Sequence, residues 1–517
     1  MRLKYNFIGL ILVCGLGLSS CNDSFLDRYP KDKLSDASFW KNAEDAQKFA
    51  NGIYLYLVEP ENHTIMTDCY TDNAIPVHVS AEQGQLSAGT ATSSNPHFLQ
   101  LWTTAYEGIR RCLVFYQHIG EVPMDEGERS QLTAEVQFLE AFFYSNILKY
   151  MGGAPLLDHP LELNEQIPSR SSEEDTYNYI VGLLDKAAPN LPDIRTSSDH
   201  GKPSAGACYA LKARLAFYAH KYDVAETAAQ KVMDMGVYDL YNNYGDLFQP
   251  VAELCNEIIF DREYLENPKN SSEGSYIGQF FAPVIMGGWE ALSPTQDLID
   301  SYPCQDGKSI QESTLYDPEN PFANRDPRLG FSVLWNGSQI AGRTFNLNNM
   351  GDGSHTRTGY AMRKYINPDN DGINNYDWTN FIYIRYAEVL LTYAEARNET
   401  LASPDDKVYK AVNAIRQRPS VDLPPLPAGL SKDQMREAIR LERRLEFAFE
   451  GIHLFDTRSY KTTEKDVTKP VFGVNAKGER ISVETRKFNP DRDYLWAIPL
   501  EEVDLAQGAL KQNPGWD

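Results

Sequence analysis

The chain has 517 residues with 49 Lys or Arg against 72 Asp or Glu, giving a net charge of −23. A negative field of this size repels phosphate backbones and anionic membrane surfaces, so it disfavours nucleic acid as a partner. Hydrophobic residues form 42% of the chain, which excludes a disordered protein.

The first 20 residues have the organisation of an export signal. Two basic residues precede an apolar run over 7–18, which is too short to span a bilayer because a spanning helix needs about 20 residues. The run ends in LSSC, which resembles a bacterial lipobox. We therefore predict a signal peptide over 1–20 and a diacylated Cys21 that tethers the mature protein. The alternative is an uncleaved or conventionally cut signal before an ordinary cysteine.

Helical periodicity dominates the chain after this signal. Apolar residues recur at three- and four-residue steps in four stretches, at 44–57, 97–119, 129–151 and 173–191. Residues 203–236 then form a predicted helix pair with small residues such as Ala213 and Ala229 at facing positions. A second pair is predicted over 381–399 and 406–419. The spacing resembles tetratricopeptide packing, although a generic helical hairpin has much the same pattern.

Two segments lack this periodicity. Residues 59–97 and 237–380 are rich in Gly, Pro, Asn and Asp, which are turn-forming residues. Long loops inside a compact chain are usually functional or disordered, and the aromatic content favours ordered loops here. We therefore expect a mainly helical protein with minor β structure and long loops.

Five cysteines remain after Cys14 and Cys21, at positions 69, 112, 208, 255 and 304. Their odd number leaves at least one free thiol, and no C-x-x-C spacing occurs, so neither a disulfide framework nor a zinc site is predicted. Cys112 and Cys208 lie in helical patterns and are expected to pack as small hydrophobic residues.

The segment 433–455 combines an apolar stripe with many charges. The stripe consists of Met435, Ile439, Leu445, Phe449 and Ile452. The charges within the same turns are Arg440, Glu442, Arg443, Arg444, Glu446 and Glu450. Because buried charges persist only when paired, we interpret these as ion pairs of helix packing; a catalytic carboxylate among them is the alternative.

Motifs for common enzyme chemistries are missing from the sequence. There is no H-E-x-x-H, G-x-S-x-G or G-x-G-x-x-G. The segment NPDNDG imitates part of a calcium loop through Asn367, Asp369 and Asp371, but its twelfth position is Trp378 instead of a bidentate Glu, which favours a turn over a metal site. Neither a metal nor a cofactor is predicted.

Motifs in chain order resemble the SusD/RagB family, the surface glycan-binding lipoproteins of Bacteroidetes. They are FLDRYPKDKLSDASFWKNAEDAQKFANGIY (25–54) after the lipobox, LTAEVQFLEAFFYSNILKYMGGAPLL, RYAEVLLTYAEARNE with AVNAIRQR, IRLERRLEFAFEGIHLFDTRSY, and YLWAIPLEEVDLAQGALKQNPGW. Two positions depart from the family's usual pattern, namely Trp516 and Ser459. The resemblance implies one domain over 21–517, with an N-terminal family region over 22–235, the loop-rich region 237–380, and a C-terminal family region over 290–517.

The resemblance further implies a non-catalytic protein with a SusD-like helical body of tetratricopeptide-like helix pairs. Such a protein binds a glycan on loops at one face and delivers it to a SusC-like TonB-dependent transporter at the cell outer membrane. The alternatives are a glycan-cleaving enzyme on the same helical body and a helical-repeat adaptor that binds protein.

The candidate ligand residues come from loop position, because sugars need aromatic faces and polar partners. They are Trp289, Trp378, Tyr376, Asp72, Asn73, His78, Arg363 and Tyr365. For each Trp the alternative is a loop-anchoring ring in the core, and for each polar residue it is a turn-stabilising side chain.

Overall fold

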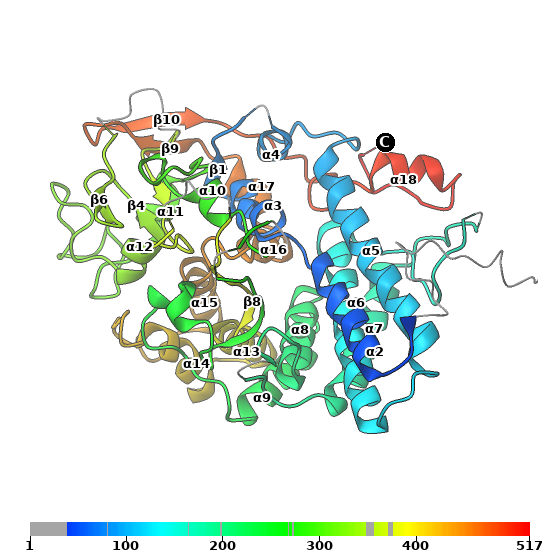
Figure 1. The fold of residues 1–517 in the computed structure, drawn as a ribbon. Coiled ribbons are helices and arrows are strands. Elements are labelled where there is room, and N and C mark those ends of the chain that lie inside the picture. Colours follow the sequence, from blue (N-terminus) through cyan, green and yellow to red (C-terminus); the bar gives the residue numbers. More distant parts are fainter. Residues whose placement is uncertain are drawn as a thin grey trace, which may run out of the picture.

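The computed structural model describes residues 39–516, except 80, 164, 197–198, 267, 271–272, 348–355 and 371–375. The predicted signal peptide and Cys21 therefore lie outside the described residues. The main N-terminal helices are α2 (Ala43–Ile53), α5 (Pro96–Ile119), α6 (Glu126–Met151) and α7 (Glu173–Ala187). Each helix is capped at its N-terminus by a side chain that accepts a hydrogen bond from a backbone N–H of the first turn. The capping residues are Asn42, Asn95, Asp125 and Ser172 respectively. They pack side by side at one end of the molecule (Figure 1).

Two further helix pairs confirm the predicted packing. They are α8 (Ala205–Tyr218) with α9 (Tyr222–Asp234), and α13 (Tyr386–Thr400) with α14 (Asp406–Arg416). Ala213 and Ala229 are buried between neighbouring helices, and α13 packs on both α9 and α14. The predicted hydrophobic role of Cys112 and Cys208 is also confirmed, because both are fully buried free thiols.

The strands form five separate two-stranded antiparallel pairs. The strands are β1 (Ala74–Pro76) with β3 (Leu292–Pro294), β2 (Ile258–Arg262) with β8 (Phe381–Arg385), β4 (Val333–Leu334) with β7 (Ala361–Met362), β5 (Gln339–Ile340) with β6 (Arg343–Thr344), and β9 (Val471–Val474) with β10 (Arg480–Glu484). The short helices are α3 (Pro60–His63), α4 (Glu82–Ser87), α10 (Ile277–Phe281), α11 (Gln296–Ser301), α12 (Pro327–Ser332), α17 (Thr463–Val467) and α18 (Leu500–Leu505).

Two helix boundaries differ from the sequence expectation. Residues 381–385 were expected to begin a helix, but FIYIR is strand β8, because its aromatic and β-branched residues pair with β2. The apolar stripe of 433–455 is also divided. Helix α15 (Lys432–Glu446) ends before Phe449, whose φ of +66° is left-handed, and α16 (His453–Tyr460) follows.

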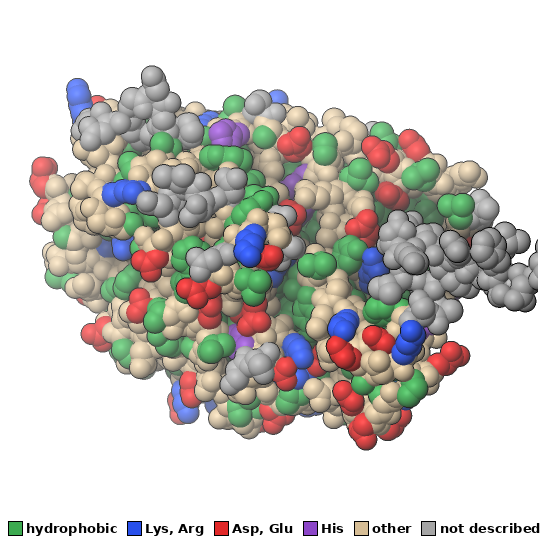
Figure 2. Space-filling model, in the orientation of Figure 1, with side chains coloured by type: hydrophobic (Ala, Val, Ile, Leu, Met, Phe, Trp, Pro, Cys, Tyr) green, Lys and Arg blue, Asp and Glu red, His purple; other side chains and the backbone are tan. Residues whose placement is uncertain are grey.

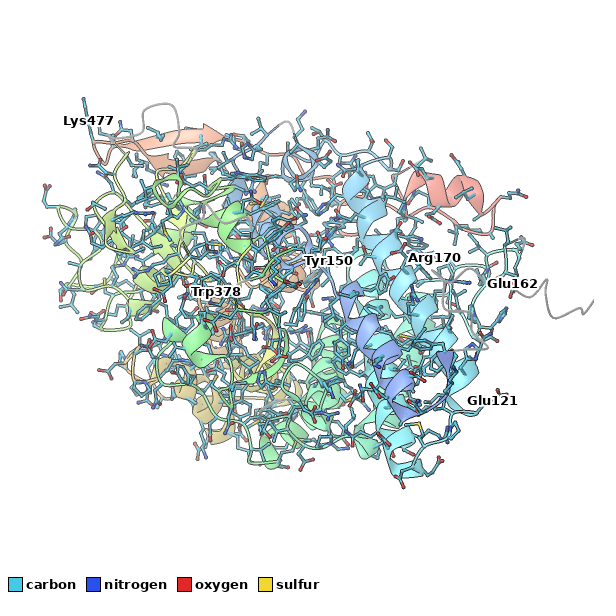
Figure 3. The ribbon with its side chains drawn as sticks, viewed as in Figure 1. Glu121, Tyr150, Glu162, Arg170, Trp378 and Lys477 are labelled. Atoms are coloured by element: carbon cyan, nitrogen blue, oxygen red, sulfur yellow. The ribbon has the colours of Figure 1, made fainter. Side chains whose placement is uncertain are left out.

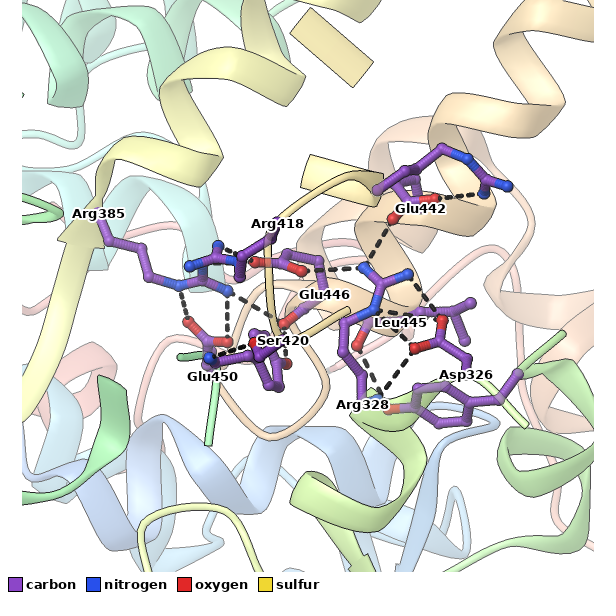
Figure 4. A network of polar contacts seen from close by, with 12 residues as sticks. Asp326, Arg328, Arg385, Arg418, Ser420, Glu442, Leu445, Glu446 and Glu450 are labelled. Atoms are coloured by element: carbon purple, nitrogen blue, oxygen red, sulfur yellow. Dashed lines mark hydrogen bonds and ion pairs between the residues drawn. The ribbon is translucent and has the colours of Figure 1, made fainter. Parts of the chain in front are cut away.

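The charged residues of α15 form the predicted ion pairs with buried arginines of other segments (Figure 4). Arg385 contacts Glu257, Glu446 and Glu450 at 2.9, 2.8 and 2.7 Å. Arg418 contacts Glu446 at 2.9 Å, and Arg328 contacts the same carboxylate at 2.9 Å.

This network determines the protonation of its central carboxylate. Burial alone would raise the pKa of Glu446, but the guanidinium groups of Arg418, Arg385 and Arg328 hold that pKa well below its usual range. The charge is therefore retained in the core, where it joins α15 to the loop-rich region and to β8.

The molecular surface carries acidic side chains throughout the face shown in Figure 2, with Lys and Arg among them. In the part of the chain that the structure describes, no helix combines the length and the apolarity that a membrane crossing requires.

Candidate functional site

Four partly exposed aromatic rings lie in a row in the loop-rich region, and we call them the aromatic strip. The ring centroids of Tyr376 and Tyr276 are 5.3 Å apart, those of Tyr276 and Phe280 are 6.4 Å apart, and those of Phe280 and Trp289 are 5.1 Å apart. Trp289 is 44% exposed, although large aromatic side chains are usually buried. The strip therefore presents apolar ring surface to solvent.

The Trp289 end of the strip is held by backbone contacts with α10. The amide of Trp289 donates to the Gln279 carbonyl at 2.7 Å, and the Ala291 amide donates to the Phe280 carbonyl at 2.8 Å. The preceding Gly288 packs so closely on Ala282 that a Cβ atom would lie 2.2 Å from its carbonyl oxygen. Glycine at this position is thus what allows the Trp289 segment to lie against α10.

The Tyr376 end is held by an isolated β-bridge between two loops. Ser275 and Asp377 exchange backbone hydrogen bonds of 2.8 and 2.7 Å. The Asp377 side chain is buried and accepts from the backbone and hydroxyl of Thr379, both at 3.0 Å. The bridge places Tyr376 beside Tyr276, although 100 residues separate them along the chain.

A buried carboxyl group fixes the centre of the strip. Glu61, on α3, accepts a hydrogen bond from the backbone amide of Tyr276 and is 4% exposed. Burial raises the pKa of Glu61 to about 7, although the amide of Tyr276 favours its ionised form. A hydrogen bond therefore joins the strip directly to α3 in the segment 59–97.

Trp289 and Phe280 also line a pocket of 470 Å³, which we call the Trp289 pocket. Its other polar lining residues are Asn62, His78, Glu82, Gln83, His97 and Gln100. Gln83 donates to Asn62 at 3.2 Å, and Gln100 donates to Glu59 at 3.2 Å. Amide and carboxylate groups of this kind can donate to and accept from hydroxyl groups.

His97, which lines the pocket, stacks on a second buried histidine behind it. The rings of His63 and His97 are stacked with centroids 4.1 Å apart, and both side chains are buried. Burial lowers the pKa of His63 to about 4, and it lowers the pKa of His97 well below its ordinary value, so both rings are neutral at pH 7.

The structure brings three of the eight predicted ligand residues to this region. Trp289 and the exposed His78 both line the pocket, and Tyr376 belongs to the strip. Trp378 is half-buried on the segment that follows the Ser275–Asp377 bridge (Figure 3).

Asp72 and Asn73 are placed elsewhere, in a buried polar cluster. Asp72 lies 2.8 Å from Nε2 of His453 and 3.0 Å from Arg444, while Asn73 donates to Asp68 at 2.7 Å. Burial would raise the pKa of Asp72, but Arg444 and His453 hold it well below its usual range. Their side chains stabilise the fold and do not fit the predicted ligand contact.

Arg363 and Tyr365 also do not fit that role. Tyr365 is fully buried with its ring centroid 5.0 Å from that of Phe248, and its φ is +64°. The half-buried Arg363 donates to the Gly330 carbonyl at 2.9 Å. Tyr365 therefore packs in the core, and Arg363 joins its segment to α12.

Sequence reasoning missed Tyr276 and Phe280. The signal was available in SYIGQFF, where aromatic residues four apart fall on one side of a helical turn. Because α10 has only five residues, its periodicity is too short to stand out in a turn-rich segment.

The NPDNDG segment behaves as a turn where it is described. The Asn367 side chain accepts from the Asp369 amide at 3.0 Å, which is an Asx turn. Asp371 lies outside the described residues, and the described ones contain no cluster of three or more His, Cys, Asp or Glu that could hold a metal ion.

The fold and the strip together define a mainly helical binding protein whose loops carry an exposed aromatic surface. Comparison with known families agrees. Residues 256–516 match the model of the SusD family, and residues 24–217 match a family model described as starch-binding and associating with the outer membrane. The chain belongs to the SusD family.

Individual relatives match nearly the whole chain. A SusD-like protein of Bacteroides fragilis is 30% identical with a TM-score of 0.82, over 94% of this chain and 100% of its own. A SusD-like carbohydrate-binding protein of the same species is 26% identical with a TM-score of 0.83, over 91% and 99% of the two chains. SusD-like protein P38 of Formosa agariphila is 26% identical over 92% of this chain and 94% of its own length.

Proposed function

We propose that this protein is a non-catalytic glycan-binding lipoprotein that holds an oligosaccharide on the aromatic strip and in the Trp289 pocket. The observation that carries the proposal is the row of four partly exposed rings beside a pocket with polar lining. The C–H faces of sugar rings pack on aromatic rings, while their hydroxyl groups need donors and acceptors. The site supplies both kinds of contact.

The site is suited to a neutral oligosaccharide of more than one unit. Successive ring centroids of the strip are 5.1 to 6.4 Å apart, so an extended ligand contacts several rings. The His97 ring that lines the pocket is uncharged, and the chain has a net charge of −23. Both features disfavour a polyanion at this position.

Membership of the family supports the wider role. One matching model is described as starch-binding and associating with the outer membrane, and one relative is named a carbohydrate-binding protein. We propose that Cys21 carries the lipid anchor, that the protein is exposed at the cell surface, and that it delivers its ligand to a SusC-like TonB-dependent transporter for nutrient uptake.

Calorimetry with neutral oligosaccharides tests the site, using the chain from residue 22 onward. We expect Trp289→Ala to weaken binding at least tenfold, which corresponds to about 1.4 kcal/mol, because a central aromatic contact is lost. Trp40→Ala is the matched control, because Trp40 stacks on His118 with centroids 4.9 Å apart. His118 lies 21 residues beyond the pocket residue His97 on α5, which is about 30 Å along the helix.

The same samples separate the alternatives. If Trp289→Ala bound the oligosaccharide with unchanged affinity, the aromatic strip would not be part of the binding site. Released sugar in product analysis would identify a glycan-cleaving enzyme, and co-purification of a protein ligand without glycan binding would identify an adaptor.

Two experiments on cells test the anchor and the partner. Mass spectrometry of the native N-terminus should find a diacylated Cys21, and Cys21→Ala should release the protein from the membrane fraction. Affinity purification from detergent-solubilised outer membranes should recover the transporter; its absence would contradict the delivery role.

A further inference from the structure

A second pocket, of 500 Å³, lies between the helical end of the molecule and the C-terminal segment. Its walls come from the end of α6, the start of α7, the end of α8, and α16 with Tyr494. We call it the Phe455 pocket. It shares no lining residue with the Trp289 pocket.

Three cations line the Phe455 pocket, namely Lys149, Arg458 and Lys461. Within the described residues none of them forms an ion pair. Nζ of Lys149 lies over the Phe455 ring at 4.8 Å, and Nζ of Lys461 lies over the Tyr494 ring at 4.1 Å. These cation–π contacts leave the hydrogen-bonding capacity of both ammonium groups unused.

Arg458 is the most unusual of the three. It is 9% exposed, and its Nε and Nη1 atoms are buried without a hydrogen-bond partner. Its one hydrogen bond runs from Nη2 to the Asp493 carbonyl at 3.4 Å, whereas the buried Arg385 and Arg418 are each paired with carboxylates. A buried charge without a counter-ion is strongly destabilising, so this arrangement favours the entry of an anion.

The acidic residues on the same walls have other partners. Glu174 forms an ion pair with Lys221 at 2.9 Å. Glu173 lies near the Arg170 guanidinium, whose pKa is lowered chiefly by burial and partly restored by this carboxylate. The cations of the pocket are therefore not neutralised from within the protein.

We propose that the Phe455 pocket binds the carboxylate of a small sugar acid. Lys149 and Lys461 bind the carboxylate, and the Arg458 charge attracts it. Ser459 and Nε2 of His220, whose Nδ1 contacts the Tyr222 hydroxyl at 2.8 Å, also line the pocket and can bind the sugar hydroxyl groups. A peptide fits less well, because the walls are mainly helices whose backbone groups are already bonded, and peptides usually bind along sheet edges or grooves.

Binding should depend on pH through Lys149. Burial and the Arg214 charge lower its pKa to about 7, against the opposing effect of Glu388. A bound carboxylate favours the charged ammonium, so affinity should rise as pH falls from 8 to 6, a range in which a sugar carboxylate stays ionised. Tyr177 and Tyr218, whose pKa values are raised chiefly by burial, stay neutral in this range. The other titratable side chains that line the pocket are His220, Glu173 and Glu174.

Ligand-observed NMR and calorimetry with glucuronate test this site on the chain from residue 22 onward, with glucose as the neutral probe. We expect glucuronate to bind at least tenfold more tightly than glucose, and Lys149→Met to abolish that preference while keeping the packing on Phe455. Lys231→Met is the matched control, because its Nζ lies over the Tyr209 ring at 4.7 Å outside the pocket, and it should bind like the parent protein.

A second variant keeps the test valid if Lys149→Met fails to fold. Lys461→Met removes an exposed cation from the rim and should weaken glucuronate binding by a smaller factor. Equal affinity for glucuronate and glucose would overturn the proposal, as would full binding by Lys149→Met. If a short peptide with a free C-terminal carboxylate bound more tightly than glucuronate, and this binding depended on Lys149, the proposed sugar-acid ligand would be wrong and the ligand would be a peptide C-terminus. Trp289→Ala should leave glucuronate binding unchanged, so failure here is distinct from failure of the aromatic strip.

Discussion

The helices at one end and the loop-rich region 237–380 are stabilised in different ways. In α5 to α9 the backbone groups bond within each helix, and the interior is filled by apolar residues such as Phe142, Leu211 and Val232. In the loop-rich region, buried arginines bond backbone carbonyls as well as carboxylates. Arg325 donates to Ile299 and Tyr302 at 2.6 and 2.7 Å.

The difference follows from the backbone. Irregular chain leaves carbonyl groups without partners, and a guanidinium with five donors can satisfy several of them at once. In this region the buried charges thus take the place of the regular hydrogen bonds of helices. Four substitutions test this comparison.

The largest effect should follow Arg385→Met. The change leaves Glu450 with Lys364 as its one remaining cation within the described residues and weakens the pairing of Glu257 and Glu446 in the core. We expect the free energy of unfolding to fall by about 4 kcal/mol, because the loss of one partner leaves buried charge uncompensated. Urea denaturation measures this. A loss below 1 kcal/mol would show that the network does not hold the loops.

Glu61→Gln should have a pH-dependent effect. Burial raises the pKa of Glu61 to about 7 from 4.5 in the unfolded chain, so its contribution is most favourable below pH 4.5 and declines as pH rises through 7. Gln keeps an acceptor for the Tyr276 amide and does not ionise. Relative to the parent, the variant should gain about 2.5 kcal/mol of stability between pH 5 and pH 8. Parallel stability curves for the two proteins would contradict the burial of this carboxyl group.

Val232→Ala tests the helical end. Val232 is fully buried on α9, and loss of two methyl groups should cost about 2 kcal/mol of stability, including the cavity that remains. Because the contacts are apolar and local, the loss should not change between pH 5 and pH 8. A pH-dependent loss would contradict the view that apolar contacts alone stabilise the helical end.

Arg397→Met should have the smallest effect. Arg397 pairs with Asp405 and Glu226, but its side chain is 21% exposed. Exposed ion pairs contribute little, so we expect a loss below about 1 kcal/mol. Arg397→Met and Arg385→Met should be measured in the same denaturant series. The difference between their losses of stability shows how much the burial of an ion pair contributes beyond the pairing itself.

Sequence alone predicted the helices well because their periodicity is a local property. It failed at 381–385 and at Phe449, where pairing with β2 and a left-handed turn decide the conformation. Within the site, loop position selected Trp289 and Tyr376. It also selected Asp72, because nothing near that residue in sequence shows that Arg444 and His453 reach it from the C-terminal part of the chain.

The aromatic strip draws its support from three distant parts of the chain, through Glu61, the α10 segment and the Ser275–Asp377 bridge. A ligand that spans the strip would therefore act as a crosslink between segments that otherwise join only through the fold. At a hundred times its dissociation constant, such a ligand adds about 2.7 kcal/mol to stability. The ligand-bound protein should then resist proteases better than the empty one, so that its lifetime increases with the supply of ligand.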